Sequence, residues 1–120
     1  MRIAHIGLWK ILDGSEQNML KDQEIIASFK GQVAGCLESS ASPLIEIPRS
    51  AASIKAFGAG DPSQLTDGYN WALYMIFDSK ESRAAYEDDP LHATVAPYLM
   101  PSLDGPVTDS ILQADFELPD

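Results

Sequence analysis

Tyr86 and His92 are the two residues whose types and spacing best suit acid–base chemistry. They lie on either side of Pro90 in the stretch YEDDPLH. Proline stops a preceding helix and is favoured in the first turn of a new one. Pro90 therefore predicts one helix ending at about Asp88 and another beginning at Pro90. Tyr86 and His92 would then converge on the concave side of the bend.

His92 is predicted to act as a general base. It shares a helix face with Val95, Ala96 and Leu99, so it points toward the interior. A helix N-terminus and partial burial both disfavour positive charge, which leaves the neutral imidazole that a base needs. The alternatives are a core histidine bonded to a backbone carbonyl and, for Tyr86, a side chain that only fills the core.

His5 is a polar residue in the middle of the apolar run RIAHIGLW. If its face of a strand looks toward the helices, His5 meets Tyr86 and His92. On the same alternation, apolar side chains would form the walls of a substrate pocket beside these three. The predicted pocket residues are Trp9, Trp71, Leu73 and Met75.

Asp115 is a carboxylate late in the last apolar run, with the neighbours QADFEL. A buried carboxylate needs a partner, and an imidazole would serve. The alternative is an exposed acid at the end of a strand.

The elements that position these residues follow from periodicity. Apolar positions at intervals of three, four and seven predict a helix over 15–39, whose end includes ESSASP. Strands are predicted at 2–9, 52–61, 69–78 and 107–118, and the helices around Pro90 at 79–88 and 90–99. This order, β-α-β-β-α-β, predicts an α+β fold of the ferredoxin-like type with a four-stranded antiparallel sheet.

The first and third strands are apolar on both faces. One face of such a sheet is covered by its own helices, so the other needs a different cover. A second sheet is the simplest cover. We therefore expect a homodimer whose two sheets close into a barrel-like core.

Composition narrows the class of protein. The chain has 120 residues and a formal net charge of −10, which predicts a single domain over 1–120 and argues against nucleic acid and anionic membranes as partners. One cysteine, Cys36, excludes an internal disulfide, and we expect it to be a buried structural thiol. No apolar run approaches the roughly 20 residues that span a bilayer, and no signal peptide is evident. The expected location is cytoplasmic.

Other chemical motifs are absent from the sequence. The GAG at 58–60 lacks the third glycine of a dinucleotide fingerprint and is read as a turn. Two histidines and one cysteine show no zinc-ligand spacing. No nucleophilic triad or phosphate loop is visible. We therefore expect no metal and no cofactor, and any chemistry would be proton transfer in an apolar pocket.

Four segments resemble the stress-responsive dimeric α/β-barrel (Dabb) family. They are HIGLW, FGAGD, GYNWALYMIFDS and, above all, AAYEDDPLHATV, which is similar to the family signature Y-x-x-[HD]-P-x-H. The chain departs from the pattern at Asp89, where a histidine often precedes the proline, at Gly7, and in a longer connection at 38–50.

The resemblance implies site roles. In a plant polyketide cyclase of this family, the catalytic tyrosine and histidine match Tyr86 and His92. That cyclase's strand histidine matches His5, and the carboxylate that orients its catalytic histidine matches Asp115.

Three functions remain open. The first is a cofactor-independent cyclase or lyase of secondary metabolism that acts on a small hydrophobic polyketide-like substrate, with a polyketide synthase upstream. The second is a non-catalytic, stress-responsive binding or interaction protein. The third is a cofactor-free monooxygenase of the related antibiotic-monooxygenase type. A cavity of roughly 300 Å³ or more beside His92 and Tyr86 would favour the enzymes.

Overall fold

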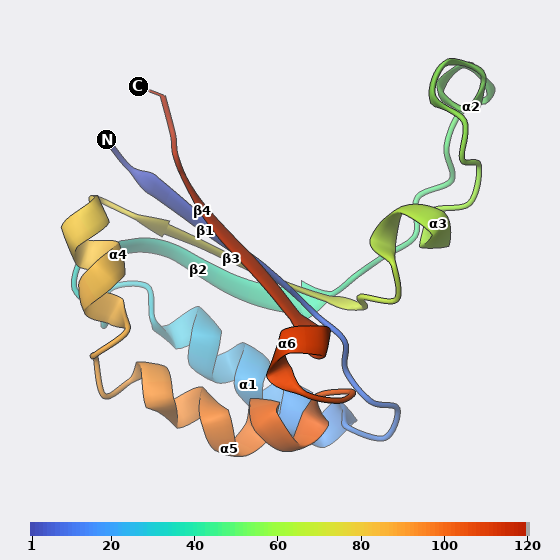
Figure 1. Ribbon diagram of the computed structural model, residues 1–120. Helices are drawn as coiled ribbons and strands as arrows, with labels where there is room; N and C mark the ends of the chain where they lie inside the picture. The colour runs from blue at the N-terminus through green and yellow to red at the C-terminus, as the bar shows by residue number, and fades with distance from the viewer. Residues whose placement is uncertain (120) are drawn as a thin grey trace.

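The protein forms one four-stranded antiparallel sheet with helices packed on one face. A computed structural model describes residues 1–119. The strands are β1 (Ile3–Trp9), β2 (Cys36–Pro43), β3 (Trp71–Phe77) and β4 (Ile111–Glu117), in the spatial order β2-β3-β1-β4. Figure 1 shows α1 (Glu16–Ser28) and α5 (Ala96–Leu99) beneath the sheet. The predicted ferredoxin-like fold is confirmed.

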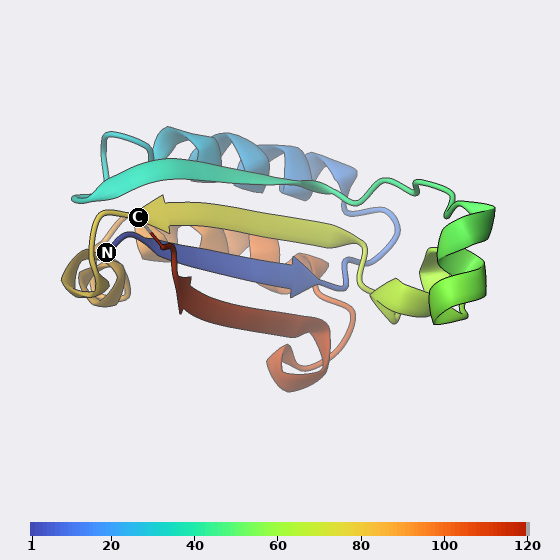
Figure 2. The ribbon, with the colours of Figure 1, turned by 90° about the horizontal axis from the view of Figure 1, so that it is seen from above.

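The alternation of β1 sets the two faces of the sheet. Ile3, His5 and Trp9 are buried on the helix side, whereas Ile6 is 40% exposed on the other side. Figure 2 views the sheet from that open side. The helix side contains the core, to which α1 contributes Met19 and Ile26.

The second strand lies earlier than predicted. Residues 36–43 pair with β3 instead of ending a helix, and α1 stops at Ser28. Gly35 explains part of this difference, because its φ of +76° favours glycine. A Cβ at this position would collide with the Ser82 side chain. The apolar spacing continues past Ser28, but the backbone turns away.

The predicted strand at 52–61 is wrong, because Ala51–Phe57 forms helix α2. The Ser50 hydroxyl caps this helix by accepting a hydrogen bond from the Ser53 amide, and Gly58 ends it with φ +95°. A second short helix, α3 (Ser63–Thr66), follows. The connection between β2 and β3 is therefore helical.

The region from Lys80 to Ser110 contains more and shorter helices than the two that were predicted. Helix α4 covers Lys80–Tyr86, a 3-10 helix covers His92–Val95 before α5, and another follows at Met100–Ser102. Residues Val107–Ser110 form helix α6 rather than the start of β4. The bend at Pro90 remains, with the Leu91 amide bonded to the Asp89 carboxylate at 2.9 Å.

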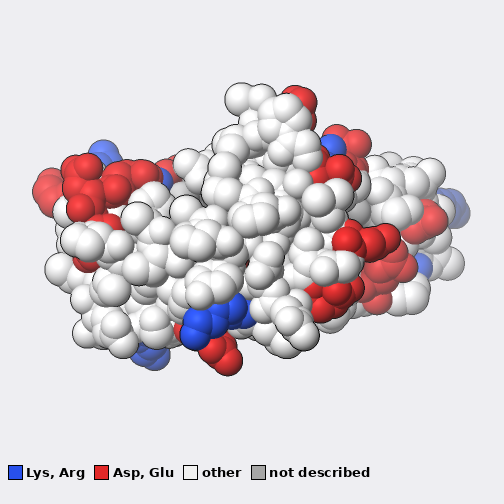
Figure 3. Space-filling view, turned by 90° about the horizontal axis from the view of Figure 1, so that it is seen from below, with Lys and Arg blue, Asp and Glu red and all other residues white. Residues whose placement is uncertain are grey.

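The helix side carries its charge at the margins. Figure 3 shows acidic side chains gathered toward both ends of this face and a largely uncharged middle. A polyanion would meet no continuous basic surface there. No helix within residues 1–119 is both long enough and apolar enough to cross a membrane.

Candidate acid–base site

Tyr86 and His92 lie against each other at the bend. Tyr86 is the last residue of α4 and is 4% exposed, and His92 begins the next helical turn with its side chain 36% exposed. Their ring centroids are 4.4 Å apart, at an interplanar angle of 48°. Pro90 thus separates the two residues along the chain while the bend brings their rings into contact.

His5 approaches the same place from the sheet. It is 3% exposed on β1, and its ring centroid lies 6.4 Å from that of Tyr86. The structure therefore brings His5, Tyr86 and His92 together from three elements.

Asp115 pairs with His5 instead of with His92. The two residues are direct neighbours across β1 and β4, and His5 Nδ1 lies 2.8 Å from Asp115 Oδ1. Nδ1 of His92 faces Glu87, at 3.4 Å from its carbonyl oxygen and 4.0 Å from its carboxylate. The carboxylate that the resemblance matched to an orienting residue for His92 therefore contacts His5 instead.

Arg83 is a site residue that the sequence reasoning missed. Its side chain is 12% exposed, and its Nε donates to Asp115 Oδ1 at 2.7 Å. Its Nη1 donates to Glu87 Oε1 at 2.8 Å. The sequence contained one sign of this role, because Arg83 is three and four positions before Tyr86 and Glu87 and therefore lies next to both on a helix.

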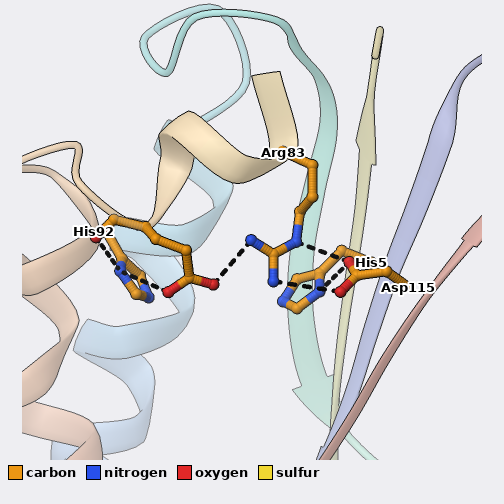
Figure 4. A network of polar contacts seen from close by, with 5 residues as sticks. His5, Arg83, His92 and Asp115 are labelled. Atoms are coloured by element: carbon orange, nitrogen blue, oxygen red, sulfur yellow. Dashed lines mark hydrogen bonds and ion pairs between the residues drawn. The ribbon is translucent and has the colours of Figure 1, made fainter. Parts of the chain in front are cut away.

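These contacts form one polar chain between the two histidines. The chain runs from His92 through Glu87 and Arg83 to Asp115 and His5. Figure 4 shows how His92, Arg83, Asp115 and His5 lie within it. Arg83 supplies one positive charge between two carboxylates. The protonation of His5 is therefore coupled to the charges of Arg83, Asp115 and Glu87.

Burial and Arg83 together lower the pKa of His5. Burial acts first, because it disfavours the charged imidazolium, and the nearby guanidinium adds to it, although Asp115 works in the opposite direction. Burial would raise the pKa of Asp115, but hydrogen bonds from Arg83 and His5 outweigh it, and this pKa is lowered. His5 is thus held neutral beside an ionised carboxylate.

Burial raises the pKa of the Tyr86 phenol well above its ordinary value. Arg83 acts in the opposite direction but more weakly. Tyr86 therefore remains a protonated hydrogen-bond donor across the physiological pH range.

A cavity of about 390 Å³ opens beside these three side chains, between the sheet and the helices. Apolar side chains form most of its surface. The predicted pocket residues Trp9 and Leu73 contribute to it, whereas Met75 is fully buried in the core and Trp71 borders a smaller pocket of about 130 Å³. Residues of the cavity that were not predicted include Ile26, Val95, Leu99, Met100 and Ile111.

A second, more open groove of about 500 Å³ lies on the outer side of the Arg83 contacts. Its lining includes Arg83, Glu87 and Asp115, together with Lys80 and Phe116. The charged part of the network thus borders the outer groove, and the two histidines and Tyr86 border the inner cavity.

Asp22 is a buried acid outside the network. It is 0% exposed on the inner face of α1, and neither carboxylate oxygen has a hydrogen-bond partner among residues 1–119. Burial raises the pKa of Asp22 to about 7. Within the same described residues, no group of three or more His, Cys, Asp or Glu side chains is arranged to hold a metal ion.

The family model described as the stress responsive A/B barrel domain matches residues 3–118. The chain belongs to the Dabb family. No curated protein matches it by sequence.

Solved structures agree with this Dabb fold. A dimeric ferredoxin-like protein of unknown function from Jannaschia is 18% identical, with a TM-score of 0.70, covering 98% of this chain and 100% of that one. A hydroxynitrile lyase from Passiflora edulis is 12% identical, with a TM-score of 0.68 and coverages of 99% and 94%. A candidate antibiotic biosynthesis monooxygenase from Caulobacter crescentus is 12% identical, with a TM-score of 0.66 and coverages of 99% and 91%. At these identities, the likeness establishes the fold of this Dabb protein.

Proposed function

We propose that this protein is a cofactor-independent lyase or cyclase that acts by acid–base chemistry on a small, apolar, polyketide-like substrate. The observation that carries the proposal is the cavity of about 390 Å³ bordered by His5, Tyr86 and His92. This volume lies within the range of small-molecule sites, and a few polar groups in an apolar pocket are their usual pattern. A filled core would have favoured the non-catalytic alternative.

His92 and Tyr86 would act on one reacting centre. Neutral His92 removes a proton from a carbon between two carbonyls, and the protonated Tyr86 phenol donates a hydrogen bond to the developing enolate. The carbanion attacks a ketone carbon farther along the substrate, which forms a carbon–carbon bond and an alkoxide. The His92 imidazolium returns its proton to this alkoxide, so the histidine is regenerated.

His5 would place a polar group of the substrate. With Nδ1–H donated to Asp115, neutral His5 presents Nε2 as an acceptor. Asp115 holds that tautomer, and Arg83 holds Asp115. In this account, Asp115 is a positioning residue for His5 rather than for His92.

A second candidate is cleavage of an α-hydroxynitrile, which the fold shared with the Passiflora enzyme supports. A base takes the hydroxyl proton, the bond to the nitrile carbon breaks, and an aldehyde and cyanide leave, with the proton passing to cyanide. The same His92 and Tyr86 positions suit this step, because it also needs one base and one donor in an apolar pocket.

The proposal is tested by turnover of two probes beside melting curves. A linear tri-β-keto thioester with a short alkyl tail serves as the cyclase probe, and mandelonitrile serves as the lyase probe. Oxygen uptake is recorded with the first probe to register the monooxygenase alternative. We expect turnover of one probe by the parent protein and loss of it in His92→Ala without loss of folding. Normal turnover by a His92→Ala protein that melts far below the parent would show that His92 is a core histidine.

We also propose that two copies associate through the open faces of their sheets. Ile6, Tyr74, Leu112 and Phe116 lie on that face, and each is 40% or more exposed. Leu112 and Ile6 border an apolar groove of about 310 Å³. The Jannaschia protein with the same fold is described as dimeric, and burial of these side chains against a second copy would remove them from water.

A further inference from the structure

The connection between β2 and β3 stands away from the body of the protein. We call residues 45–69 the arm. A hydrogen bond of 2.8 Å from the Leu44 amide to the Asn70 carbonyl closes its base. Asn70 is also bonded to the backbone of Ile11 through its side chain, in both directions. The arm is thus a long loop whose two ends are held together by hydrogen bonds at its base.

The arm has an internal structure of its own. Arg49 donates to the carbonyl of Ala59 and to the hydroxyl of Ser53, which ties the ends of α2 together. Neither α2 nor α3 contributes a buried residue. The arm is folded, yet Tyr69 at its base is the only buried residue within 45–69.

Large apolar side chains of the arm are left in water. Phe57 is 82% exposed, Ile45 79% and Ile47 70%. Leu65 and Ile54 are also exposed. Such a concentration on a short, preorganised segment is typical of a surface that a partner covers.

The direction of the arm identifies the partner. Figure 1 shows that α2 rises on the side of the sheet opposite α1 and α5, and Figure 2 shows the arm extending beyond one end of the strands. The cavity beside His92 lies on the helix side, so the arm cannot cover the cavity of its own chain. The open apolar sheet face lies on the same side as the arm. A second protein molecule packed on that sheet face would lie beside α2.

We propose that the arm embraces a second copy of this chain, with Ile47 and Phe57 packing against the partner subunit. The proposal rests on the sheet-to-sheet dimer proposed above and goes beyond it, because it extends the interface from the sheet face to the arm. By two-fold symmetry, each subunit would contribute one arm, and the interface would be the same patch on both.

The first test compares dimer dissociation constants by sedimentation. Phe57→Ser and Ile47→Ser should each weaken the dimer by about 10-fold or more, because each removes a large apolar contact. Lys55→Ser, a change at an exposed position on the same helix as Phe57, is the matched control and should leave the constant unchanged. All three side chains are exposed in the single chain, so the variants should fold like the parent.

The second test asks what the arm touches. Phe57→Cys protein labelled with a maleimide-benzophenone, prepared in light and heavy isotopic forms and mixed, should give crosslinks between light and heavy peptides on irradiation. The buried Cys36 is not expected to react. Crosslinks confined to one chain would overturn the inference.

The outcomes separate the two proposals. If the parent is dimeric and its Ile47 and Phe57 variants dimerise equally well, the proposed contact between arm and partner is overturned, whereas the sheet-to-sheet dimer is not. A parent that is monomeric at millimolar concentration would overturn both. Binding of the arm to an unrelated protein, with dimerisation unchanged in the Ile47 and Phe57 variants, would also overturn the proposed contact between arm and partner.

Discussion

His5 and Asp115 face each other across two adjacent strands, with Nδ1 of the imidazole 2.8 Å from the carboxylate although 110 positions separate them in the chain. Arg83 closes on the same carboxylate from α4. Asp115 raises the pKa of His5 and Arg83 lowers it, so the two neighbours oppose each other at one imidazole.

Arg83→Gln should raise the pKa of His5, because the substitution removes the positive charge that disfavours the imidazolium. The measurement is an NMR titration of the imidazole in a His92→Ala background, where His5 is the only histidine. Lys80→Gln, which removes the exposed Lys80–Glu117 pair, is the control and should leave the titration in place. A His5 pKa that does not move would contradict the proposed network.

Asp115→Asn should shift the same titration in the opposite direction. The amide oxygen can still accept the Nδ1 proton, but the negative charge that favours the imidazolium is gone. Turnover should fall if Asp115 holds the working tautomer of His5. A His5 pKa that rises in this variant would show that Asp115 is not its electrostatic partner.

The double variant His92→Ala/Tyr86→Phe should lose little turnover beyond the worse single variant. Each single change should lower turnover by about 10²-fold or more, the scale of one acid–base group. Their effects should not add, because the two rings lie 4.4 Å apart and would act on one transition state. Strictly additive losses, measured with whichever probe the parent turns over, would argue for two independent roles.

Asp22→Leu should stabilise the protein more at pH 8 than at pH 4. The pKa of Asp22 is raised in the folded state, from 3.8 to about 7. Between these values the unfolded chain loses the proton while the folded chain keeps it, so stability falls as pH rises and remains low above about 7. The Leu variant lacks this loss. Its melting temperature should exceed that of the parent by roughly 5 °C or more at pH 8.

Glu24→Leu is the matched control for Asp22, because Glu24 is an exposed acid on the same helix, with its side chain 74% exposed. Its effect on melting temperature should be nearly constant between pH 4 and pH 8. The interpretation of Asp22 as a strained buried acid would be refuted by an Asp22→Leu difference that is equally independent of pH.

Leu112→Asp should convert the proposed dimer into a monomer of 13.0 kDa. The side chain lies at the apolar groove of the open sheet face, where a buried, unpaired carboxylate is costly. Leu20→Asp, on exposed α1 surface, provides the comparison and should leave the mass in light scattering unchanged. Identical masses for the parent and Leu112→Asp would place the interface elsewhere.

Local spacing in the sequence determined the features that depend on neighbours in the chain. The Pro90 bend limits how Tyr86 and His92 can be oriented, because six positions separate them and both flanking turns are helical. The alternation of β1 likewise places His5 and Trp9 on one face and Ile6 on the other. These rules need no knowledge of the rest of the chain.

Only the tertiary structure decided which distant groups meet. The serine-rich segment at 36–43 forms an edge strand because it pairs with β3, although its own pattern looked like the end of a helix. By contrast, the segment 51–57 is a helix for local reasons, because Ser50 caps its start, Gly58 ends it and its alanines favour a helix. Asp115 meets His5 through the β1–β4 register and Arg83 through the packing of α4, which lies 32 positions earlier in the chain. Register and packing are properties of the whole sheet, so residue spacing alone does not contain them.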